Sequence, residues 1–316
     1  MRLIRKICII IAVIVLAVLW GSAAMKVYRV AAAMYDEKFS FRCTTDPEDA
    51  FTISDFPGLT RERHTFASNK GQTLVGYLYQ QEDASFEKKA VVVFAHGLGG
   101  GGQTGYMDMF AYLAKQGYYV FAYDATGNDE SEGEVIGGLP QGVIDLDYAI
   151  NYAYSIEEIA ELPVVLMGYS WGGFSVVNVL NYHPEVRAVA SIAGFNKSTD
   201  LVEYYGSQVA GDKAKLIVPF VTVHEYLKFG KYAFSSAMNG FAKSDCDVMI
   251  VHGKRDTVVP FEYGYGTYYE KYGNDERFTF KSYRSRGHDL SKEPDGDPHV
   301  ALLQSVVDFF DQSLTE

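Results

Sequence analysis

The segment Gly168–Gly172, which reads Gly-Tyr-Ser-Trp-Gly, restricts the fold of this chain more than any other. It follows the apolar run Pro163–Met167, which predicts a buried strand, and it precedes residues 173–180, which predict a helix. A glycine on either side of Ser170 lets the chain turn sharply, because a Cβ at either position would crowd the turn. We therefore interpret Ser170 as a nucleophile exposed between a strand and a helix. The alternative is a structural turn with a bystander serine.

Predicted strands and helices alternate along most of the chain. Alternating apolar residues predict an early antiparallel strand at Thr73–Gln80. Further strands are predicted at Ala90–Ala95, Tyr118–Tyr123, Pro163–Met167, Val186–Ala193, Asp247–Val251 and Phe278–Tyr283. The segments between them predict helices at Met107–Gln116, Gly142–Tyr154, Phe261–Tyr272 and Val300–Leu314. Continuous apolar strands that alternate with helices indicate an α/β fold with a mostly parallel sheet, covered by helices on both faces.

Residues 196–244 interrupt this alternation. They separate two predicted core strands by far more than a loop and one helix, and they are rich in Tyr, Phe and Val, unlike a disordered linker. Apolar residues at helical spacing predict a helix around residues 218–228. We expect a helical cap over the carboxyl edge of the sheet, with Tyr204, Phe220 and Leu227 as candidates to line an acyl pocket. The alternative is a structural excursion with no part in binding.

A nucleophilic serine on such a turn needs an acid and then a histidine later in the chain. Asp256 lies just past a predicted core strand, where its carboxylate would orient an imidazole. His288 lies in the loop before the last predicted helix, and an imidazole takes and returns a proton near neutral pH. His299 is the alternative base, and Asp256 is alternatively a turn residue with a local backbone bond.

Two backbone N–H groups are expected to form an oxyanion hole. One belongs to Trp171, the residue after the serine, and the other to Leu98 in the glycine-rich loop Gly97–Gly102. Glycines let the backbone of such a loop approach a developing oxyanion closely. No Gly-Lys-Ser/Thr follows, so the loop is not predicted to bind a nucleotide.

The N-terminus predicts a membrane segment. Three of the first six residues are basic, and the apolar run Ile7–Met25 spans 19 residues, enough to cross a hydrocarbon core of about 30 Å. The basic residues favour a cytoplasmic N-terminus, which places the rest of the chain outside the cytoplasm. A cleaved signal peptide, with a cleavage site at Ser22–Ala24, is the alternative and implies secretion. Residues 26–41 predict a juxtamembrane helix.

Charge and composition exclude other classes of function. The formal net charge is −12, and an acidic surface argues against nucleic acid as a partner. No cluster of Cys and His has the spacing of metal ligands, so no metal site is predicted. Cys43 and Cys246 could form a disulfide in an oxidising compartment, but two separate buried thiols are the favoured interpretation.

These segments together resemble the α/β-hydrolase superfamily, and within it the serine aminopeptidase and monoacylglycerol-lipase-like branch. The resemblance covers about Arg61 to the C-terminus, and the matching segments are His96–Gly99, Tyr123–Gly133, Gly168–Gly173, His252–Pro260 and Gly287–His288. In that branch the second of these segments usually reads Asp-x-Arg-Gly-x-Gly-x-Ser-x-Gly. Thr126 replaces the arginine here and Asp129 replaces a glycine, so any contact that the arginine makes is lost.

The resemblance implies acyl transfer to water from an ester or amide, with no cofactor. Because the cap is apolar and a membrane is near, we expect a lipid-like or other apolar carboxylic ester as substrate. The second hypothesis is an aminopeptidase or amidase that acts on small peptides, with Asp200, Glu203 or Glu225 binding the substrate ammonium. The third is a binding module on a hydrolase fold that has lost catalysis.

The same reasoning divides the chain into an anchor or signal, a juxtamembrane segment, a hydrolase core in two parts and a cap. Their expected bounds are residues 1–25, 26–60, 61–195 with 245–316, and 196–244, respectively.

Overall fold

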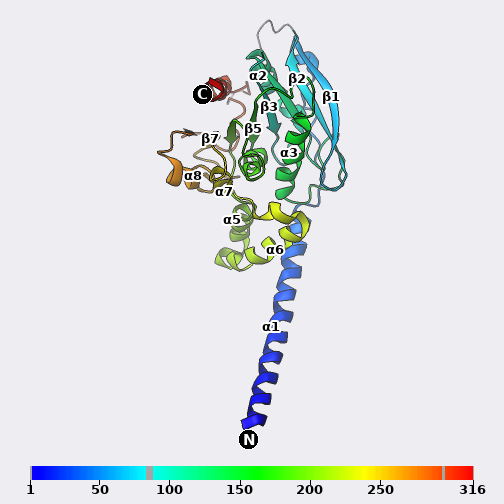
Figure 1. The fold of residues 1–316 in the computed structure, drawn as a ribbon, viewed down its shortest axis with the longest axis vertical. Helices are drawn as coiled ribbons and strands as arrows, with labels where there is room; N and C mark the ends of the chain where they lie inside the picture. Colours follow the sequence, from blue (N-terminus) through cyan, green and yellow to red (C-terminus); the bar gives the residue numbers. More distant parts are fainter. Residues whose placement is uncertain (1, 83–87, 294–295, 316) are drawn as a thin grey trace.

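The computed structural model describes residues 2–82, 88–293 and 296–315, and it contains one eight-stranded sheet (Figure 1). The strand order is β1-β2-β4-β3-β5-β6-β7-β8; β2 is antiparallel to both of its neighbours, β1 and β4, and all other neighbouring strands are parallel. The strands are β1 (Leu59–Ala67), β2 (Thr73–Gln81), β3 (Ala90–Ala95), β4 (Tyr118–Tyr123), β5 (Val164–Tyr169), β6 (Ala188–Ile192), β7 (Asp247–Gly253) and β8 (Phe278–Tyr283).

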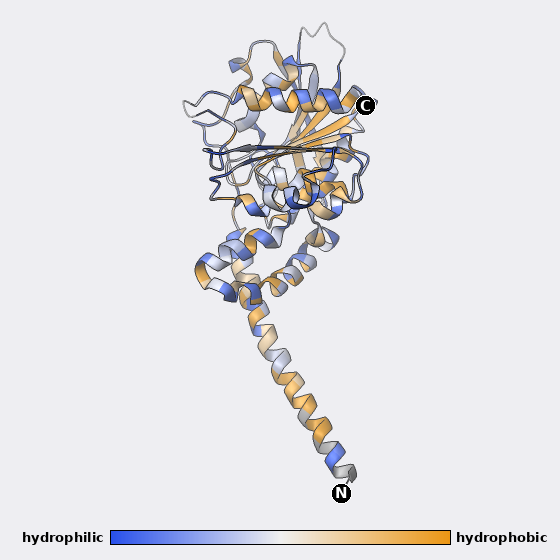
Figure 2. Ribbon diagram, turned by 90° about the vertical axis from the view of Figure 1, so that its left-hand side faces the viewer, coloured by the Kyte–Doolittle hydropathy of each residue, from blue (hydrophilic) through white to orange (hydrophobic). Residues whose placement is uncertain are grey.

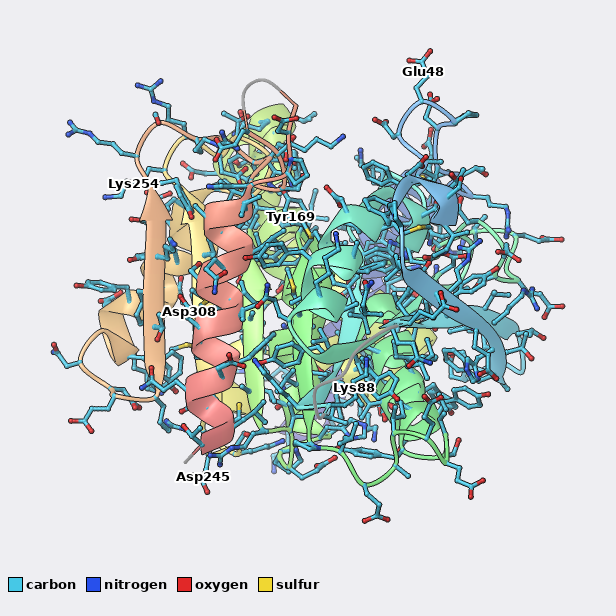
Figure 3. All side chains as sticks on the ribbon, turned by 90° about the horizontal axis from the view of Figure 1, so that it is seen from above. Glu48, Lys88, Tyr169, Asp245, Lys254 and Asp308 are labelled. Atoms are coloured by element: carbon cyan, nitrogen blue, oxygen red, sulfur yellow. The ribbon has the colours of Figure 1, made fainter. Side chains whose placement is uncertain are left out.

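Helices cover both faces of this sheet, as the alternating pattern predicts. Helices α2 and α9 pack on one face, and α3, α4 and α8 pack on the other. Figure 3 shows α9 lying along the sheet, with Asp245 and Lys254 at the two ends of β7. The helices are α1 (Arg2–Lys38), α2 (Met107–Lys115), α3 (Pro140–Ala153), α4 (Trp171–Asn178), α5 (Ser198–Ala210), α6 (Val218–Phe229), α7 (Ala237–Phe241), α8 (Tyr265–Tyr272) and α9 (Val300–Thr315).

The predicted fold class is confirmed, and so is every predicted strand, with shifts of a few residues at their ends. Strand β1 was not predicted, because most of its side chains are exposed and its sequence contains charged residues instead of an apolar run. Its register is set by pairing along its whole length with β2. The helix predicted from Phe261 begins as a short 3₁₀ turn, and α8 proper starts at Tyr265.

Residues 196–244 form the helical excursion that the sequence predicts. Helices α5, α6 and α7 lie between β6 and β7, and the first two lie beside the upper end of α1 (Figures 1 and 2). The hydroxyl of Tyr205 on α5 donates to the carbonyl of Val258, which follows β7, at 2.7 Å. The excursion therefore lies at the carboxyl ends of the strands, and we call residues 196–244 the cap.

Helix α1 is a single helix of 37 residues, roughly 55 Å long. Its segment Ile9–Lys38 is long and apolar enough to cross a membrane, and no described residue of its most apolar stretch is buried in the protein. Figure 2 shows this apolar part projecting away from the domain. The helix continues without a break beyond the apolar run Ile7–Met25. From Tyr28 onward its residues contact the cap.

Polar contacts join the end of α1 to α6. The hydroxyl of Tyr35 donates to Oε1 of Glu225 at 2.7 Å, and Asp36 accepts hydrogen bonds from Lys228 at 2.6 Å and from His224 at 3.0 Å. Glu225 is fully buried, and Ser198 also donates to its Oε1. The last turns of α1 are therefore part of the folded domain rather than a free tether.

We expect Glu225→Gln to weaken the pH dependence of stability. Burial raises the pKa of the Glu225 carboxyl to about 7, outweighing the hydrogen bonds from Ser198 and Tyr35 and the nearby charge of Lys228. The folded state then holds more protons than the unfolded chain between about pH 4.5 and pH 7, so stability falls as the pH rises through this window. Thermal melting of the full chain in detergent should show a steeper fall in the wild type than in the variant, in which Asp124, whose pKa burial also raises to about 7, still contributes. If the melting temperatures of the two proteins changed with pH in the same way, Glu225 would not have a raised pKa.

Cys43 and Cys246 are both buried and unpaired. The favoured prediction of two separate thiols therefore agrees with the structure.

Candidate active site

The turn between β5 and α4 holds Ser170 in a strained conformation. Its φ is 56° and its ψ is −112°, in a region that residues with a Cβ rarely occupy. A Cβ on Gly168 would lie 2.3 Å from the carbonyl oxygen of Gly172, and a Cβ on Gly172 would lie 1.8 Å from the carbonyl oxygen of Ala95. Both glycines are therefore required by close backbone packing, as the sequence indicates.

The structure brings Ser170, His288 and Asp256 into one hydrogen-bonded line. Nε2 of His288 lies 2.9 Å from Oγ of Ser170, and Nδ1 of His288 lies 2.7 Å from Oδ2 of Asp256. The Asp256 side chain is fully buried, while that of His288 is 20% exposed. This arrangement lets the imidazole accept a proton from the serine while the carboxylate fixes its tautomer.

The environment of Asp256 keeps its carboxylate ionised. Burial acts to raise its pKa, but hydrogen bonds from His252 and His288 outweigh burial and hold the pKa well below its ordinary value. The backbone N–H groups of Val258 and Val259 both donate to Oδ1 at 2.8 Å. With Oδ1 occupied, Oδ2 is the oxygen that faces the two imidazoles.

The loop after β3 lies directly against Ser170. A Cβ on Gly97 would lie 3.6 Å from the Cβ of Ser170, so Leu98 follows at the edge of the site. Trp171 is the first residue of α4, where backbone N–H groups have no partner within the helix. Both predicted oxyanion donors therefore belong to segments that border the serine.

Two side chains, the buried His96 and the partly buried Asp129, hold this loop in place. His96 accepts a hydrogen bond from the N–H of Ala125 at Nε2 (2.9 Å) and donates from Nδ1 to the carbonyl of Gly97 (2.8 Å). Burial lowers the pKa of His96, which favours the neutral form that these two bonds require. Asp129, with a φ of 32°, accepts hydrogen bonds from the N–H groups of Gly102 (2.9 Å) and Thr45 (2.6 Å).

Both departures from the family pattern have a structural account. Asp129 takes a positive φ, which explains why a glycine is usual at this position, and its carboxylate ties the glycine-rich loop to the chain that follows α1. Thr126, which replaces the arginine, binds the buried Asp145 through its N–H (2.8 Å) and its hydroxyl (3.0 Å).

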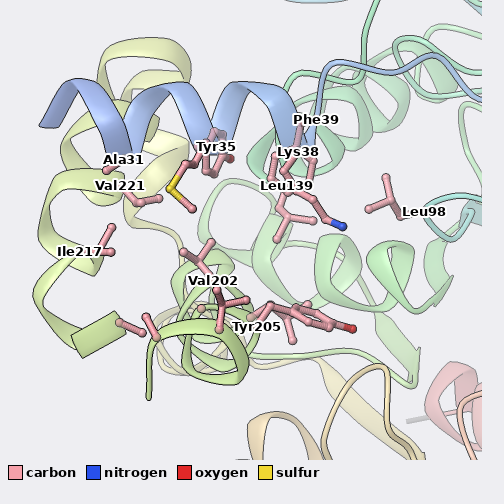
Figure 4. Close-up of a pocket in the computed structure, with 16 residues that line it drawn as sticks. Ala31, Tyr35, Lys38, Phe39, Leu98, Leu139, Val202, Tyr205, Ile217 and Val221 are labelled. Atoms are coloured by element: carbon pink, nitrogen blue, oxygen red, sulfur yellow. The ribbon is translucent and has the colours of Figure 1, made fainter. Parts of the chain in front are cut away.

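An apolar cavity of about 330 Å³ borders the site at Leu98 (Figure 4). The three candidate pocket residues, Tyr204, Phe220 and Leu227, are not among the residues that line it. Its other lining residues come from α1, the start of α3 and the cap: Ala31, Met34, Tyr35, Lys38, Phe39, Leu139, Leu201, Val202, Tyr205, Gly206, Val209, Ala210, Ala214, Ile217 and Val221.

The acidic residues considered as ammonium anchors lie elsewhere. Glu225 is buried against Tyr35 and Ser198, and Asp200 accepts a hydrogen bond from the N–H of Lys197 at the start of α5. Neither these two nor Glu203 is among the described residues that line the cavity.

Sequence reasoning missed two residues that support the site. Nε2 of His252 lies 3.2 Å from Oδ2 of Asp256 and 2.9 Å from the carbonyl oxygen of Val259. The hydroxyl of Tyr169 donates to the carbonyl of His288 and accepts from the N–H of Leu290, both at 2.7 Å. His252 lies four residues before the acid and Tyr169 directly precedes the serine, and these positions are the only sequence signals for their roles.

Comparison with protein families matches residues 87–224 to the family described as serine aminopeptidase, S33. The matched region contains the Ser170 turn and ends before Asp256. Among curated proteins, the chain is 26% identical over 202 residues to the lysophosphatidylserine lipase ABHD12 of Danio rerio, covering 58% of this chain and 50% of that protein. The chain thus spans about half the length of the curated relative it matches.

Solved structures share the fold. The Pyrococcus furiosus esterase PF2001 superposes with a TM-score of 0.63 at 16% identity, covering 87% of this chain and 98% of that one. The Pyrococcus horikoshii acylaminoacyl peptidase gives a TM-score of 0.62 at 18% identity, covering 83% of this chain and 43% of that one.

Proposed function

We propose that this chain, which is an α/β-hydrolase enzyme, cleaves carboxylic esters with an apolar acyl group through an acyl-enzyme on Ser170. The observation that carries the proposal is the hydrogen-bonded line from Ser170 through His288 to Asp256, next to an apolar cavity.

The proposed mechanism follows from this geometry. Ser170 Oγ attacks the acyl carbonyl while Nε2 of His288 takes its proton, and Asp256 stabilises the imidazolium that forms. The N–H groups of Trp171 and Leu98 bind the oxyanion of the tetrahedral intermediate. His288 then protonates the leaving group, and a water molecule, activated in the same way, releases the acid from Ser170.

An ester substrate is favoured over a peptide by the lining of the cavity. Among the described residues that line it there is no Asp or Glu, so a substrate ammonium would be desolvated there without a partner. The names of two similar proteins, a lysophosphatidylserine lipase and an esterase, agree with this choice. The aminopeptidase alternative is supported by the family description and by the acylaminoacyl peptidase fold.

For a series of acyl esters, we expect kcat/KM to rise up to about fourfold for each added methylene until the cavity is full, because burying a methylene contributes about 0.8 kcal/mol. Val202→Asp should flatten this dependence, because Val202 lines the cavity. Gln208→Asp, on an exposed face of α5, is the matched control and should leave the dependence unchanged.

The same panel tests the peptidase alternative with free and acetylated aminoacyl amides. Turnover that requires a free amine, together with ester rates that do not depend on chain length, would replace the esterase proposal with the peptidase one.

We further propose that α1 anchors the enzyme in the cell membrane, with the catalytic domain on the extracytoplasmic side. The support is the apolar helix and the basic residues before it. We expect the full chain to fractionate with membranes, and mass analysis of the mature protein to find residues before Met25. A mature N-terminus near Met25 would instead indicate a cleaved signal and a secreted enzyme.

A further inference from the structure

We propose that the last two turns of α1 form a wall of the acyl pocket, and that the pocket takes its substrate, a single-chain ester lipid, directly from the bilayer that α1 spans. This inference rests on the proposed ester hydrolase function and adds the source of the substrate to it. The N-terminal helix is then part of the substrate site as well as an anchor.

The first step of the argument is the composition of the pocket. Ala31 and Tyr35 of α1, and Phe39 directly after it, face cap residues such as Val202 and Val221 across the cavity (Figure 4). Ala31 is 3% exposed and Tyr35 is 5% exposed. Without this part of α1 the cavity would be open along one side, so the pocket is complete only when the helix is in place.

The second step is the distance along α1. From Met25, where the apolar run ends, to Ala31 the helix rises about 9 Å. The polar headgroup layer occupies roughly the first 5–8 Å beyond the hydrocarbon core. The α1 wall of the pocket therefore begins at the surface of the membrane, and the helix is continuous across this distance.

The third step is the exposed apolar surface of the cap. Val209 is 86% exposed, Leu216 is 71% exposed and Leu227 is 68% exposed. These residues belong to the part of the chain that surrounds the upper end of α1, on the side from which the apolar helix projects (Figures 1 and 2). Large apolar side chains exposed beside a membrane helix fit an interface with lipid better than one with water.

The fourth step is the polarity of the cavity along its length. Among the described residues that line it, Lys38 is the one with a charge, and its side chain extends towards the Leu98 end (Figure 4). The other lining residues carry no charge, and they include Val209, which is 86% exposed. An ester with its carbonyl at Ser170 would therefore direct its acyl chain towards the membrane side.

The volume favours one chain over two. At about 330 Å³ the cavity is at the small end of the usual range for ligand pockets, 300–1,000 Å³. A monoacyl ester therefore fits the site better than a diacyl lipid.

The decisive experiment changes the height of the domain above the bilayer. A seven-residue helical insert of Glu, Ala and Lys between Met25 and Lys26 lifts the domain by about 10 Å and turns it by only about 20°. Every contact of residues from Lys26 onward is kept. The control carries the same insert between Met1 and Arg2, which does not lift the domain. Both full-length variants are reconstituted in phosphatidylcholine vesicles and assayed with a fluorogenic monoacyl ester in the vesicle and with a water-soluble acetyl ester.

We expect the lifted variant to hydrolyse the vesicle-borne ester at least tenfold more slowly than the control, while the two hydrolyse the soluble ester at the same rate. An equal rate on the vesicle-borne ester would overturn this inference alone. Failure of the wild-type enzyme to hydrolyse either ester would overturn the proposed function, and this inference with it.

A second pair of variants tests the α1 wall. Ala31→Trp fills the cavity from α1, whereas Val30→Trp places the same side chain at a neighbouring position that is 60% exposed. We expect the ratio of kcat/KM for a dodecanoyl ester to that for an acetyl ester to fall at least tenfold in Ala31→Trp and to stay within twofold in Val30→Trp. An unchanged ratio in Ala31→Trp, with a wild-type melting curve, would show that α1 does not bound the acyl site.

Discussion

Ser170→Ala is expected to lower kcat for ester hydrolysis by about 10⁴-fold or more and to abolish labelling by a fluorophosphonate. The reason is that Ser170 Oγ, 2.9 Å from Nε2 of His288, is the atom proposed to form the acyl-enzyme. A residual rate above the uncatalysed reaction would come from the oxyanion donors and from substrate binding alone.

The fold should survive this change, because the hydroxyl is a small part of a turn whose shape depends on the neighbouring glycines. A melting temperature at or above that of the wild type is the control, since an alanine at the same strained φ adds no new clash. Labelling that persists in the variant would place the nucleophile elsewhere.

Asp256→Asn is expected to lower kcat by about 10³–10⁴-fold. Oδ1 of Asp256 accepts two backbone N–H groups at 2.8 Å, so the amide oxygen of an asparagine would take that position. The amide NH₂ would then donate to Nδ1 of His288. The imidazole would carry its proton on Nε2, facing Ser170, and would be unable to accept the proton of the serine.

The matched control for this variant is Asp289→Asn. Asp289 is next to His288 in sequence, but it is exposed and accepts hydrogen bonds from Ser291. We expect the Asp289→Asn variant to have a kcat close to that of the wild type. If Asp289→Asn lost activity and Asp256→Asn kept it, the acid of the site would be misassigned.

The sequence was sufficient for the fold because its core strands are continuous apolar runs. Strands β3, β4 and β5 are fully buried along their length, and such strands are recognised by composition alone. Strand β1 was missed for the opposite reason, since it lies at an edge and stays polar.

The three triad residues were predictable because their order in the chain and their places after strands are visible in the sequence. Ser170, Asp256 and His288 each follow a strand, and the ends of parallel strands meet at one edge of the sheet. The supporting roles of His252 and Tyr169 depend on side-chain contacts between segments, to which no local pattern corresponds. The cap was expected to line the cavity, and it does, but helical spacing does not say which face of a cap helix is turned to the site.

The part of α1 beyond the apolar run was expected to be a juxtamembrane helix, and its contacts with the cap were not foreseen. In the sequence, Tyr35 and Asp36 are part of a pattern typical of an amphipathic helix, which does not reveal their partners. Only the structure shows that they meet Glu225, His224 and Lys228 more than 180 residues later in the chain.

The most direct test of the account is the identity of the residue that carries the acyl group during turnover. The purified full-length enzyme would be mixed with excess dodecanoyl ester, quenched in acid within the first turnovers, digested and analysed by peptide mass spectrometry. The account predicts a dodecanoyl adduct on the peptide that contains Ser170, and none in Ser170→Ala. An adduct on another residue, or hydrolysis by Ser170→Ala at the wild-type rate, would contradict it.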